Sequence, residues 1–438
     1  MIDPMNDESW PRPAVAWYTV IVLMVAYILS FIDRVVIGLL VGPIRADLGI
    51  SETQMSLLYG FVFALFYTGL GVPIAWAIDR YNRRDIVAVG IAVWSAMTAL
   101  CGVARGFTEL ALARIGVAVG ESVLSPAMYS MAGDNFPEKK LGRALSVFLI
   151  GLPLGVGLAL VIGGLVIKFV ATAPQYDLPL LGTIRAWQLT FLVVGLPGLL
   201  LALWVLTIPE PARRRKPGAA THASIAETFA YLRARWRAYV SLIMGFAVLG
   251  MVMNVFQIYG VQYFIRELGL TIPQAGLRIG VAIAVCGTIG VLVGGWLTDR
   301  WRAAGAVDAA MRVGRTAAIA LIPFASACTL FGDLDLSTLF LLPIGFFTAF
   351  SFGAGAAGVV VLTPPSMRAQ ASAIYMLCLN LVGIGLAPWL TAVITQYGFQ
   401  DDLAVGKSCA IVAGGAAVLA SLLFTWGLPH MRKELTPA

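Results

Sequence analysis

The stretch Ser30-Phe31-Ile32-Asp33-Arg34-Val35 places an acid and a base side by side within a run that is otherwise apolar from Ala14 to Gly42. A run of this length predicts a helix that spans a membrane. Charges in the interior of such a helix cost roughly 2.5–3.5 kcal/mol each on insertion scales, so they need partners inside the protein and mark functional sites. We therefore interpret the rest of the chain as the structure that shelters Asp33 and Arg34.

The composition of the whole chain is that of a membrane protein. Of its 438 residues, 59% are hydrophobic and 12% are charged, which is too apolar for a soluble globular protein. The five cysteines show no CxxC spacing and are expected to be buried free thiols. The only two histidines, His222 and His430, lie outside the apolar segments, which excludes a histidine metal cluster inside the membrane. We expect neither a metal nor a cofactor.

Twelve apolar segments are long enough to span a bilayer, six on each side of a polar break. They lie at about 14–42, 54–78, 86–103, 108–132, 141–167, 187–208, 238–265, 274–298, 313–331, 337–362, 369–395 and 405–428. The pattern predicts an all-α integral membrane protein with twelve transmembrane helices in two pseudo-symmetric six-helix bundles. The expected bundles are 1–208 and 238–438, joined by a cytoplasmic linker at 209–237.

The distribution of Lys and Arg predicts the orientation, because cytoplasmic loops are enriched in both. With both termini in the cytoplasm, the cytoplasmic segments hold 21 of the 30 Lys and Arg, and Arg34 and Arg114 lie inside the membrane. We expect a multi-pass protein of the plasma (inner) membrane.

The linker contains Arg213-Arg214-Arg215-Lys216 and, further on, Ser224 and Glu227 at the spacing of a capping box. This pattern predicts an amphipathic helix on the inner membrane surface. We interpret the basic residues as a topology signal; contact with anionic lipid head groups is the alternative.

An internal repeat relates the two halves. Leu48-Gly49-Ile50-Ser51 recurs 220 residues later as Leu268-Gly269-Leu270-Thr271, Gln54 recurs as Gln274, and Asp79-Arg80 recurs as Asp299-Arg300. Two six-helix copies in parallel orientation place a substrate site near the midplane between the halves, and alternating access arises when one half rocks against the other.

The loop after the second segment carries a recognisable motif. It reads Ala75-x-x-x-Asp79-Arg80-Tyr81-Asn82-Arg83-Arg84 and resembles the signature loop of the major facilitator superfamily, with Ala75 in place of the usual glycine. The second copy, Gly295-x-x-x-Asp299-Arg300, keeps the glycine and lacks the trailing basic pair. The resemblance implies a latch at the cytoplasmic ends of the halves when the transporter faces outward, with the gating residues Asp79, Arg80, Arg83, Asp134, Asp299 and Arg300.

Two contacts follow from this resemblance. Asp79 would cap the start of the eleventh helix near Ala369, because a carboxylate is favourable at a helix N-terminus. Arg83 would pair with Asp134 at the end of the fourth helix.

Further motifs in the N-terminal half resemble the Spinster-type branch of the superfamily. They are Phe31-Ile32-Asp33-Arg34, Asp79-Arg80-Tyr81-Asn82-Arg83, and Arg114-x5-Gly120-Glu121-Ser122-x2-Ser125-Pro126 followed by Asp134-x-Phe136. Members of that branch are associated with export of sphingoid and lysophospholipid amphiphiles. The C-terminal half resembles the superfamily only.

Away from the ends of the expected spans there are four strongly charged residues, all in the N-terminal half: Asp33, Arg34, Arg114 and Glu121. Arg114 and Glu121 are two helical turns apart and share a face, whereas Asp33 and Arg34 point about 100° apart. A pairing of Asp33 with Arg114 would leave Glu121 as a carboxyl in an apolar setting. We therefore assign proton coupling to Asp33 and Glu121, and binding of an anionic head group to Arg34 or Arg114. A static ion-pair cluster that fixes helix packing is the alternative.

The second half offers an apolar wall with few polar groups. Positions 220 residues after Asp33 and Arg34 are Met253 and Asn254. One charged wall opposite one apolar wall suits an amphiphile. The further candidate substrate-binding residues are Tyr59, Tyr129, Asn254, Tyr375 and Asn380.

The sequence thus favours a secondary active transporter that is proton-coupled and moves an anionic or zwitterionic lipid-like amphiphile. A proton-coupled exporter of drugs or hydrophobic organic anions is the alternative. An enzyme is disfavoured because no nucleophile or metal constellation is present, and a channel because no ring of repeated charges lines a pore. We expect a monomer whose partners are the substrate, protons and the bilayer, with no nucleic acid.

Overall fold

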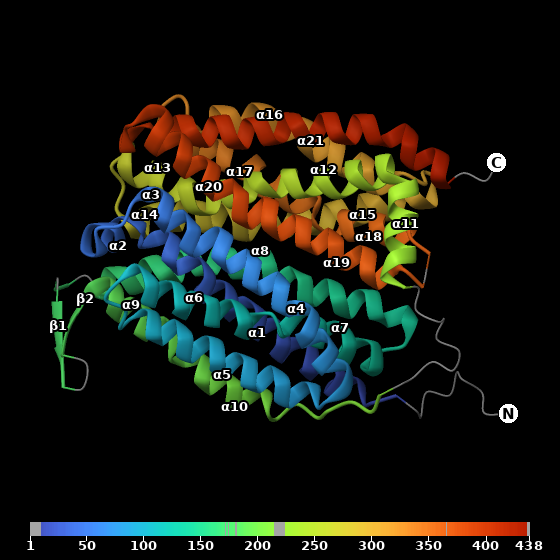
Figure 1. Cartoon of the computed structure of the whole chain (residues 1–438), viewed down its shortest axis with the longest axis horizontal. Helices are drawn as coiled ribbons and strands as arrows, with labels where there is room; N and C mark the ends of the chain where they lie inside the picture. Colours follow the sequence, from blue (N-terminus) through green and yellow to red (C-terminus); the bar gives the residue numbers. More distant parts are fainter. Residues whose placement is uncertain are drawn as a thin grey trace.

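The structure is a computed structural model that describes residues 10–170, 172–173, 175–179, 182–213, 224–364 and 366–435. Its helices form two bundles that lie side by side (Figure 1). The start of α1 and the end of α21 lie at one end of the molecule, here called the terminal end, and the strands β1 and β2 lie at the opposite end, here called the hairpin end (Figure 1).

The N-terminal bundle contains helices α1 to α10 and the only two strands among the described residues. In chain order its elements are α1 (Pro13–Leu39), α2 (Val41–Leu48), α3 (Glu52–Ser56), the π-helical turn η2 (Leu57–Phe61), α4 (Val62–Arg80), α5 (Arg83–Cys101), α6 (Phe107–Glu121), α7 (Leu124–Asn135), α8 (Glu138–Val170), β1 (Gln175–Leu178), β2 (Gly182–Arg185), α9 (Ala186–Gly195) and α10 (Pro197–Val205).

The linker helix α11 (Ile225–Ala234) precedes the C-terminal bundle. The elements of this bundle are α12 (Trp236–Val255), η3 (Phe256–Gly260), α13 (Val261–Arg266), α14 (Ile272–Ala282), η4 (Ile283–Gly287), α15 (Thr288–Ala303), α16 (Ala309–Ala327), α17 (Leu334–Phe350), α18 (Phe352–Leu362), α19 (Arg368–Cys378), η5 (Leu379–Leu386), α20 (Ala387–Val393), η6 (Ile394–Phe399), the 3₁₀ turn η7 (Asp402–Ala404) and α21 (Val405–Leu435).

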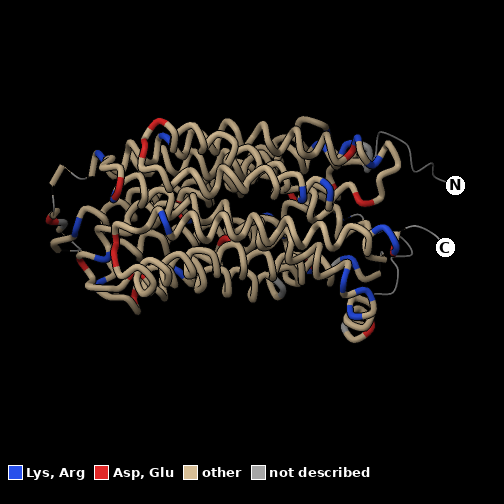
Figure 2. Tube along the Cα trace, turned by 90° about the horizontal axis from the view of Figure 1, so that it is seen from above, with Lys and Arg blue, Asp and Glu red and all other residues tan. Residues whose placement is uncertain are grey.

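The all-α membrane fold predicted from the sequence is confirmed. Within the described residues, eleven helices are long and apolar enough to cross a membrane. The twelfth expected span is α16, whose mean hydropathy is lowered by Arg312 and Arg315 in its first two turns. Helix α16 packs within the bundle against α17 and α21. Charged residues gather at the two ends of the molecule, and its middle is nearly free of them (Figure 2).

The sequence repeat has a structural counterpart at the hairpin end. Gly49 and Gly269 both adopt positive φ angles, 62° and 67°, which glycine tolerates without strain. Two residues later Ser51 and Thr271 each begin a helix, and the backbone N–H of each donates to the side-chain oxygen of the Gln three positions on. The two copies therefore enter their second helices through the same turn and cap.

The linker helix is also present as predicted. Ser224 accepts a hydrogen bond from the N–H of Glu227, and the Glu227 carboxylate accepts one from the N–H of Ser224, so α11 begins with a complete capping box. The predicted basic cluster continues into Arg214, Arg215 and Lys216, which lie outside the described residues.

Small residues allow the two bundles to approach closely. A methyl group added at Gly157 of α8 would lie 2.5 Å from the carbonyl oxygen of Gly280 in α14, so the two backbones are in direct contact. Close contacts continue toward the hairpin end, where Gly164 meets Pro273, and toward the middle, where Gly287 meets Pro153. The glycine-rich stretch of α8 thus serves helix packing.

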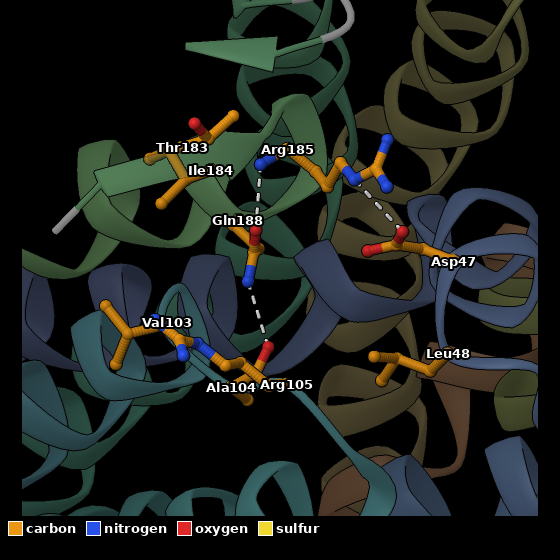
Figure 3. Close-up of a pocket in the computed structure, with 9 residues that line it drawn as sticks. All are labelled: Asp47, Leu48, Val103, Ala104, Arg105, Thr183, Ile184, Arg185 and Gln188. Carbon is orange, nitrogen blue, oxygen red and sulfur yellow. Dashed lines mark hydrogen bonds and ion pairs between the residues drawn. The ribbon is translucent and has the colours of Figure 1, made fainter. Parts of the chain in front are cut away.

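A short β-hairpin between α8 and α9 was not expected from the sequence. Its strands pair antiparallel with Gln175 opposite Arg185. The hairpin is held to the bundle by Arg185, whose Nε lies 3.1 Å from Asp47 Oδ1, and Gln188 continues the connection by donating to the carbonyl of Ala104 at 2.9 Å (Figure 3). These contacts border a pocket of about 400 Å³ that also includes Arg105. None of the predicted site residues lines it.

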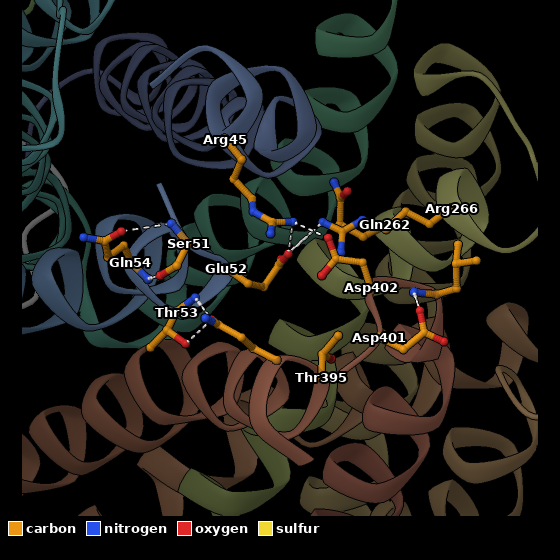
Figure 4. A network of polar contacts seen from close by, with 12 residues as sticks. Arg45, Ser51, Glu52, Thr53, Gln54, Gln262, Arg266, Thr395, Asp401 and Asp402 are labelled. Carbon is orange, nitrogen blue, oxygen red and sulfur yellow. Dashed lines mark hydrogen bonds and ion pairs between the residues drawn. The ribbon is translucent and has the colours of Figure 1, made fainter. Parts of the chain in front are cut away.

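Ion pairs join the two bundles at the hairpin end (Figure 4). Glu52, at the start of α3, is fully buried and pairs with Arg45 of its own bundle. Glu52 Oε2 also lies 3.0 Å from Nη2 of Arg266 in the C-terminal bundle. Arg45 Nη1 in turn lies 3.0 Å from Asp402 Oδ2 in that bundle. We call Arg45, Glu52, Arg266 and Asp402 the hairpin-end latch.

Neutralising the centre of this latch is expected to open the hairpin end. Glu52→Gln leaves Arg45 and Arg266 close together without the carboxylate between them, and breaking a buried pair costs about 3–5 kcal/mol. Spin labels at Arg105 and Leu336, on opposite bundles in a cysteine-free background, should report a longer distance by pulsed electron resonance.

Asp177→Asn is the matched control for the latch. Asp177 accepts a hydrogen bond from Thr183 within the hairpin at the same end of the molecule and does not belong to the hairpin-end latch. Equal distance distributions for the wild type and Glu52→Gln would contradict a latch at this position.

Candidate functional site

The four charges embedded in the bundle come together between two helices. Asp33 and Arg34 lie in the second half of α1, and Arg114 and Glu121 lie in α6. Arg34 donates to Oε2 of Glu121 through Nε at 3.0 Å and through Nη2 at 2.5 Å. The Glu121 side chain is fully buried, whereas 15% of the Arg34 side chain is exposed. Glu121 is therefore the inaccessible member of the pair, and Arg34 is the accessible one.

The pairing differs from the sequence-based expectation. Arg114 was expected to neutralise the Asp33 carboxylate; instead its Nη1 donates to the backbone carbonyl of Asp33 at 3.2 Å, and Glu121 pairs with Arg34. The expectation that Glu121 is left unpaired is therefore wrong. Arg34 points about 100° away from Asp33 around α1 and has the longer side chain, so it reaches across to α6.

Of the four embedded residues, Arg114 has the most polar atoms without a hydrogen-bond partner among the described residues. Its side chain is fully buried, and its Nε and Nη2 have no hydrogen-bond partner among the described residues. Oε1 of Glu121 also lacks a partner there. Buried polar atoms without partners are rare and costly, and they point to a site that a ligand, a proton or water completes.

Aromatic rings surround the Arg34 guanidinium. Its carbon lies 4.9 Å from the ring centre of Phe31, 4.6 Å from that of Phe63 and 4.9 Å from that of Tyr67. Phe63 also lies 5.4 Å from the guanidinium of Arg114. Such rings stabilise a cation where water is scarce. Phe63 and Tyr67 were not singled out from the sequence; their spacing of four residues on one apolar helix is the signal that was available.

The remaining predicted substrate residues are spread over both bundles. Tyr59 is buried, with its ring centre 6.2 Å from that of Tyr259. Tyr129 is 43% exposed on α7. Tyr375 is buried in α19, where its hydroxyl leaves no room for a side chain at position 355.

The two predicted asparagines make different contacts. Asn254 donates to the carbonyl of Gly250 one turn earlier in α12, at 3.0 Å. Asn380 donates to the hydroxyl of Thr68 in the opposite bundle at 2.9 Å. Asn380 therefore joins the two bundles, whereas Asn254 is held within its own helix.

Arg83 organises the terminal end of the N-terminal bundle. The predicted ion pair between Arg83 and Asp134 is present. Arg83 Nε also lies 2.6 Å from Oε1 of Glu210, and its Nη2 donates to the carbonyl of Pro211, so the start of the linker is bound at the same place. Glu210 was not singled out from the sequence.

The predicted cap by Asp79 is not formed by the residues that the structure describes. Asp79 is exposed at the end of α4, and the residue before α19, Met367, provides no side-chain cap. Arg80 and Arg300 instead stack on Trp76 and Trp296, at 4.0 and 5.2 Å, and Asp299 is exposed. The latch expected at the terminal end is therefore open here, while the hairpin end is closed.

Removing one partner of the Arg34–Glu121 pair should cost more than removing both. Arg34→Gln leaves a fully buried carboxylate without its counter-charge, for which the expected loss of stability is about 3–5 kcal/mol. Arg34→Gln/Glu121→Gln leaves no unpaired charge, so its thermal unfolding should lie closer to that of the wild type. Additive losses in this double-mutant cycle would show that the two side chains are not coupled.

Comparison with known proteins identifies the family. The model of the Major Facilitator Superfamily matches residues 23–388. An "MFS-type efflux pump" of Mycolicibacterium smegmatis is 25% identical over 98% of this chain and 96% of its own length. "Protein spinster homolog 1" of Xenopus tropicalis is 26% identical over 92% of this chain and 80% of its own length.

A solved structure shares the fold over nearly the whole chain. It is that of a bacterial homologue of the human lysosomal transporter Spinster, in an inward-facing and unoccupied conformation. Its TM-score is 0.78 at 25% identity, covering 98% of this chain and all of that one. The family and the fold are those of transporters and not of enzymes. The chain belongs to the Major Facilitator Superfamily, and within that superfamily it is similar to the Spinster proteins.

Proposed function

We propose that this transporter is proton-coupled and moves an anionic or zwitterionic lipid-like amphiphile, of the lysophospholipid or sphingoid type, by alternating access. The observation that carries the proposed proton coupling and head-group binding is the Arg34–Glu121 pair. A fully buried carboxylate is bound to the guanidinium of an arginine whose side chain is 15% exposed, and three aromatic rings enclose that guanidinium. An anionic head group that approaches Arg34 competes with Glu121, and protonation of Glu121 frees Arg34 for that head group.

Asp33 and Glu121 are the proposed proton carriers, and Arg34 or Arg114 binds the head group. The unpartnered Nε and Nη2 of Arg114 provide further donors beside Phe63. At the equivalent positions of the C-terminal half lie Met253 and Asn254, so the charged groups belong to one bundle. This asymmetry favours a molecule with one polar end and one hydrocarbon end over a sugar, which needs many hydrogen-bonding groups in both halves.

The proposed orientation places the terminal end in the cytoplasm and the hairpin end outside the plasma (inner) membrane, in agreement with the distribution of Lys and Arg. The closed hairpin-end latch and the open terminal end then make this an inward-facing conformation. In the outward-facing conformation we expect Asp79, Arg80 and Arg83, with Asp299 and Arg300, to close the terminal end. The protein is proposed to act as a monomer, with each bundle serving as one rocking unit.

The second candidate is a proton-coupled exporter of drugs or hydrophobic organic anions. The similarity to an efflux pump over nearly the whole chain favours it. It uses the same carboxylates and the same arginines, so the embedded charges support both candidates equally. The two candidates differ only in the substrate.

Transport into proteoliposomes separates the candidates. Labelled lysophospholipid and a sphingoid base should move with an imposed pH gradient, and a panel of cationic and anionic drugs should not. Movement of drugs but of no lysolipid would favour the exporter.

Neutralising the two acids tests proton coupling. Asp33→Asn and Glu121→Gln should each abolish the dependence of transport on the pH gradient, because neither amide can release a proton. Glu109→Gln is the matched control, since Glu109 is exposed and accepts a hydrogen bond from the nearby N–H of Arg105. Unchanged gradient-driven transport in both variants would contradict the assigned roles.

A further inference from the structure

A groove on the N-terminal bundle takes no part in the site described above. Its volume is about 530 Å³, and nearly all of its lining is apolar. The lining comes from α4, the turn between α4 and α5, α5, the end of α6 and the turn before α7. Its residues are Ile74, Tyr81, Asn82, Asp85, Ile86, Val89, Gly90, Val93, Val119, Gly120 and Val123.

The groove faces away from the other bundle. Helix α5, which supplies most of its lining, lies on the side of the N-terminal bundle opposite the C-terminal bundle (Figure 1). Val89, in the middle of the groove, is 63% exposed. Because α5 is one of the membrane-spanning helices, an exposed apolar groove along it is in contact with lipid.

The length of the groove matches one leaflet. Along α5 it extends from Asn82 to Val93, which at about 1.5 Å per residue corresponds to roughly 16 Å. The hydrocarbon core of a bilayer is about 30 Å thick, so one leaflet contributes about 15 Å. A single acyl chain can therefore lie along the groove from its polar end to the middle of the membrane.

Two glycines form the bottom of the groove. A methyl group at Gly90 would lie 2.9 Å from the carbonyl of Gly120, and one at Gly120 would lie 2.6 Å from the backbone nitrogen of Trp94. The backbones of α5 and α6 are thus in contact, and the Val123 side chain, whose Cγ2 would lie 2.5 Å from the methyl group at Gly90, completes the bottom of the groove. The depression is fixed by this packing and does not need a side-chain movement to form.

An exposed cation, Arg80, directly precedes the residues at the polar end of the groove in the chain. Tyr81 and Asn82 mark this end, and the ring of Tyr81 lies 6.4 Å from that of Trp76. The Arg80 guanidinium stacks on Trp76 at 4.0 Å, is exposed, and makes no ion pair with the described residues. Stacking leaves the edge of the guanidinium free to bind a phosphate through two hydrogen bonds.

We propose that this groove binds one acyl chain of an anionic phospholipid from the surrounding bilayer, with its phosphate at Arg80. The occupant is a lipid of the membrane, because the groove opens away from the second bundle and from the Arg34–Glu121 pair. The nearby Asp85 does not oppose the phosphate fully, since it is paired with Arg84 at 2.8 Å. This site does not depend on which substrate the protein transports.

Native mass spectrometry of the whole protein, with phosphatidylglycerol and phosphatidylcholine supplied in equal amounts, tests the proposal. Val93→Phe fills the groove and should remove one tightly retained lipid. Arg80→Gln should keep the chain site and reduce the preference for phosphatidylglycerol about fivefold, as expected for one arginine near a lipid surface.

Two control variants distinguish this site from general lipid binding. Val281→Phe enlarges an exposed valine on α14 of the other bundle, and Arg105→Gln removes an exposed charge at the hairpin end. Both should retain the lipid and its preference. Equal retention in Val93→Phe and the wild type, or equal losses in Val93→Phe and Val281→Phe, would overturn the proposal, as would an unchanged lipid preference in Arg80→Gln.

Discussion

The core of a bilayer contains no water, so a polar group placed there is costly unless it has a partner within the protein. This constraint accounts for the helical fold, because helices satisfy their own backbone groups. It also accounts for the arrangement of the embedded charges, which meet one another between α1 and α6. The aromatic rings of Phe31, Phe63 and Tyr67 replace the solvation that Arg34 would have in water.

Much of the architecture could be predicted because it depends on patterns that can be recognised in the sequence alone. Apolar run lengths give the spans, and the 220-residue repeat gives the two bundles and their matching caps at Ser51 and Thr271. The Arg83–Asp134 pair could be predicted from the family resemblance. Among the twelve expected spans, as far as the structure describes them, α16 alone falls short of the hydropathy expected for a span, because Arg312 and Arg315 lie near its start.

The partner of each embedded charge could not be predicted, because it depends on helix rotation and side-chain reach. A rotation of about 100° separates Asp33 from Arg34, and it decides which of them meets Glu121. The role of Glu52 could not be predicted for a similar reason. Glu52 lies next to polar residues in the sequence, and its burial involves Arg45 and Arg266, which pair with it from the two bundles. Contacts between distant segments leave no local pattern.

Arg34 and Glu121 both belong to the N-terminal bundle. A rigid rotation of one bundle against the other therefore leaves the distance between them unchanged. Such a rotation alters the dielectric constant around the pair. The interaction energy of two charges at fixed separation varies inversely with the dielectric constant. The strength of this ion pair then depends on how much water enters the cavity. A bundle movement that leaves the two side chains at the same separation still changes their interaction energy.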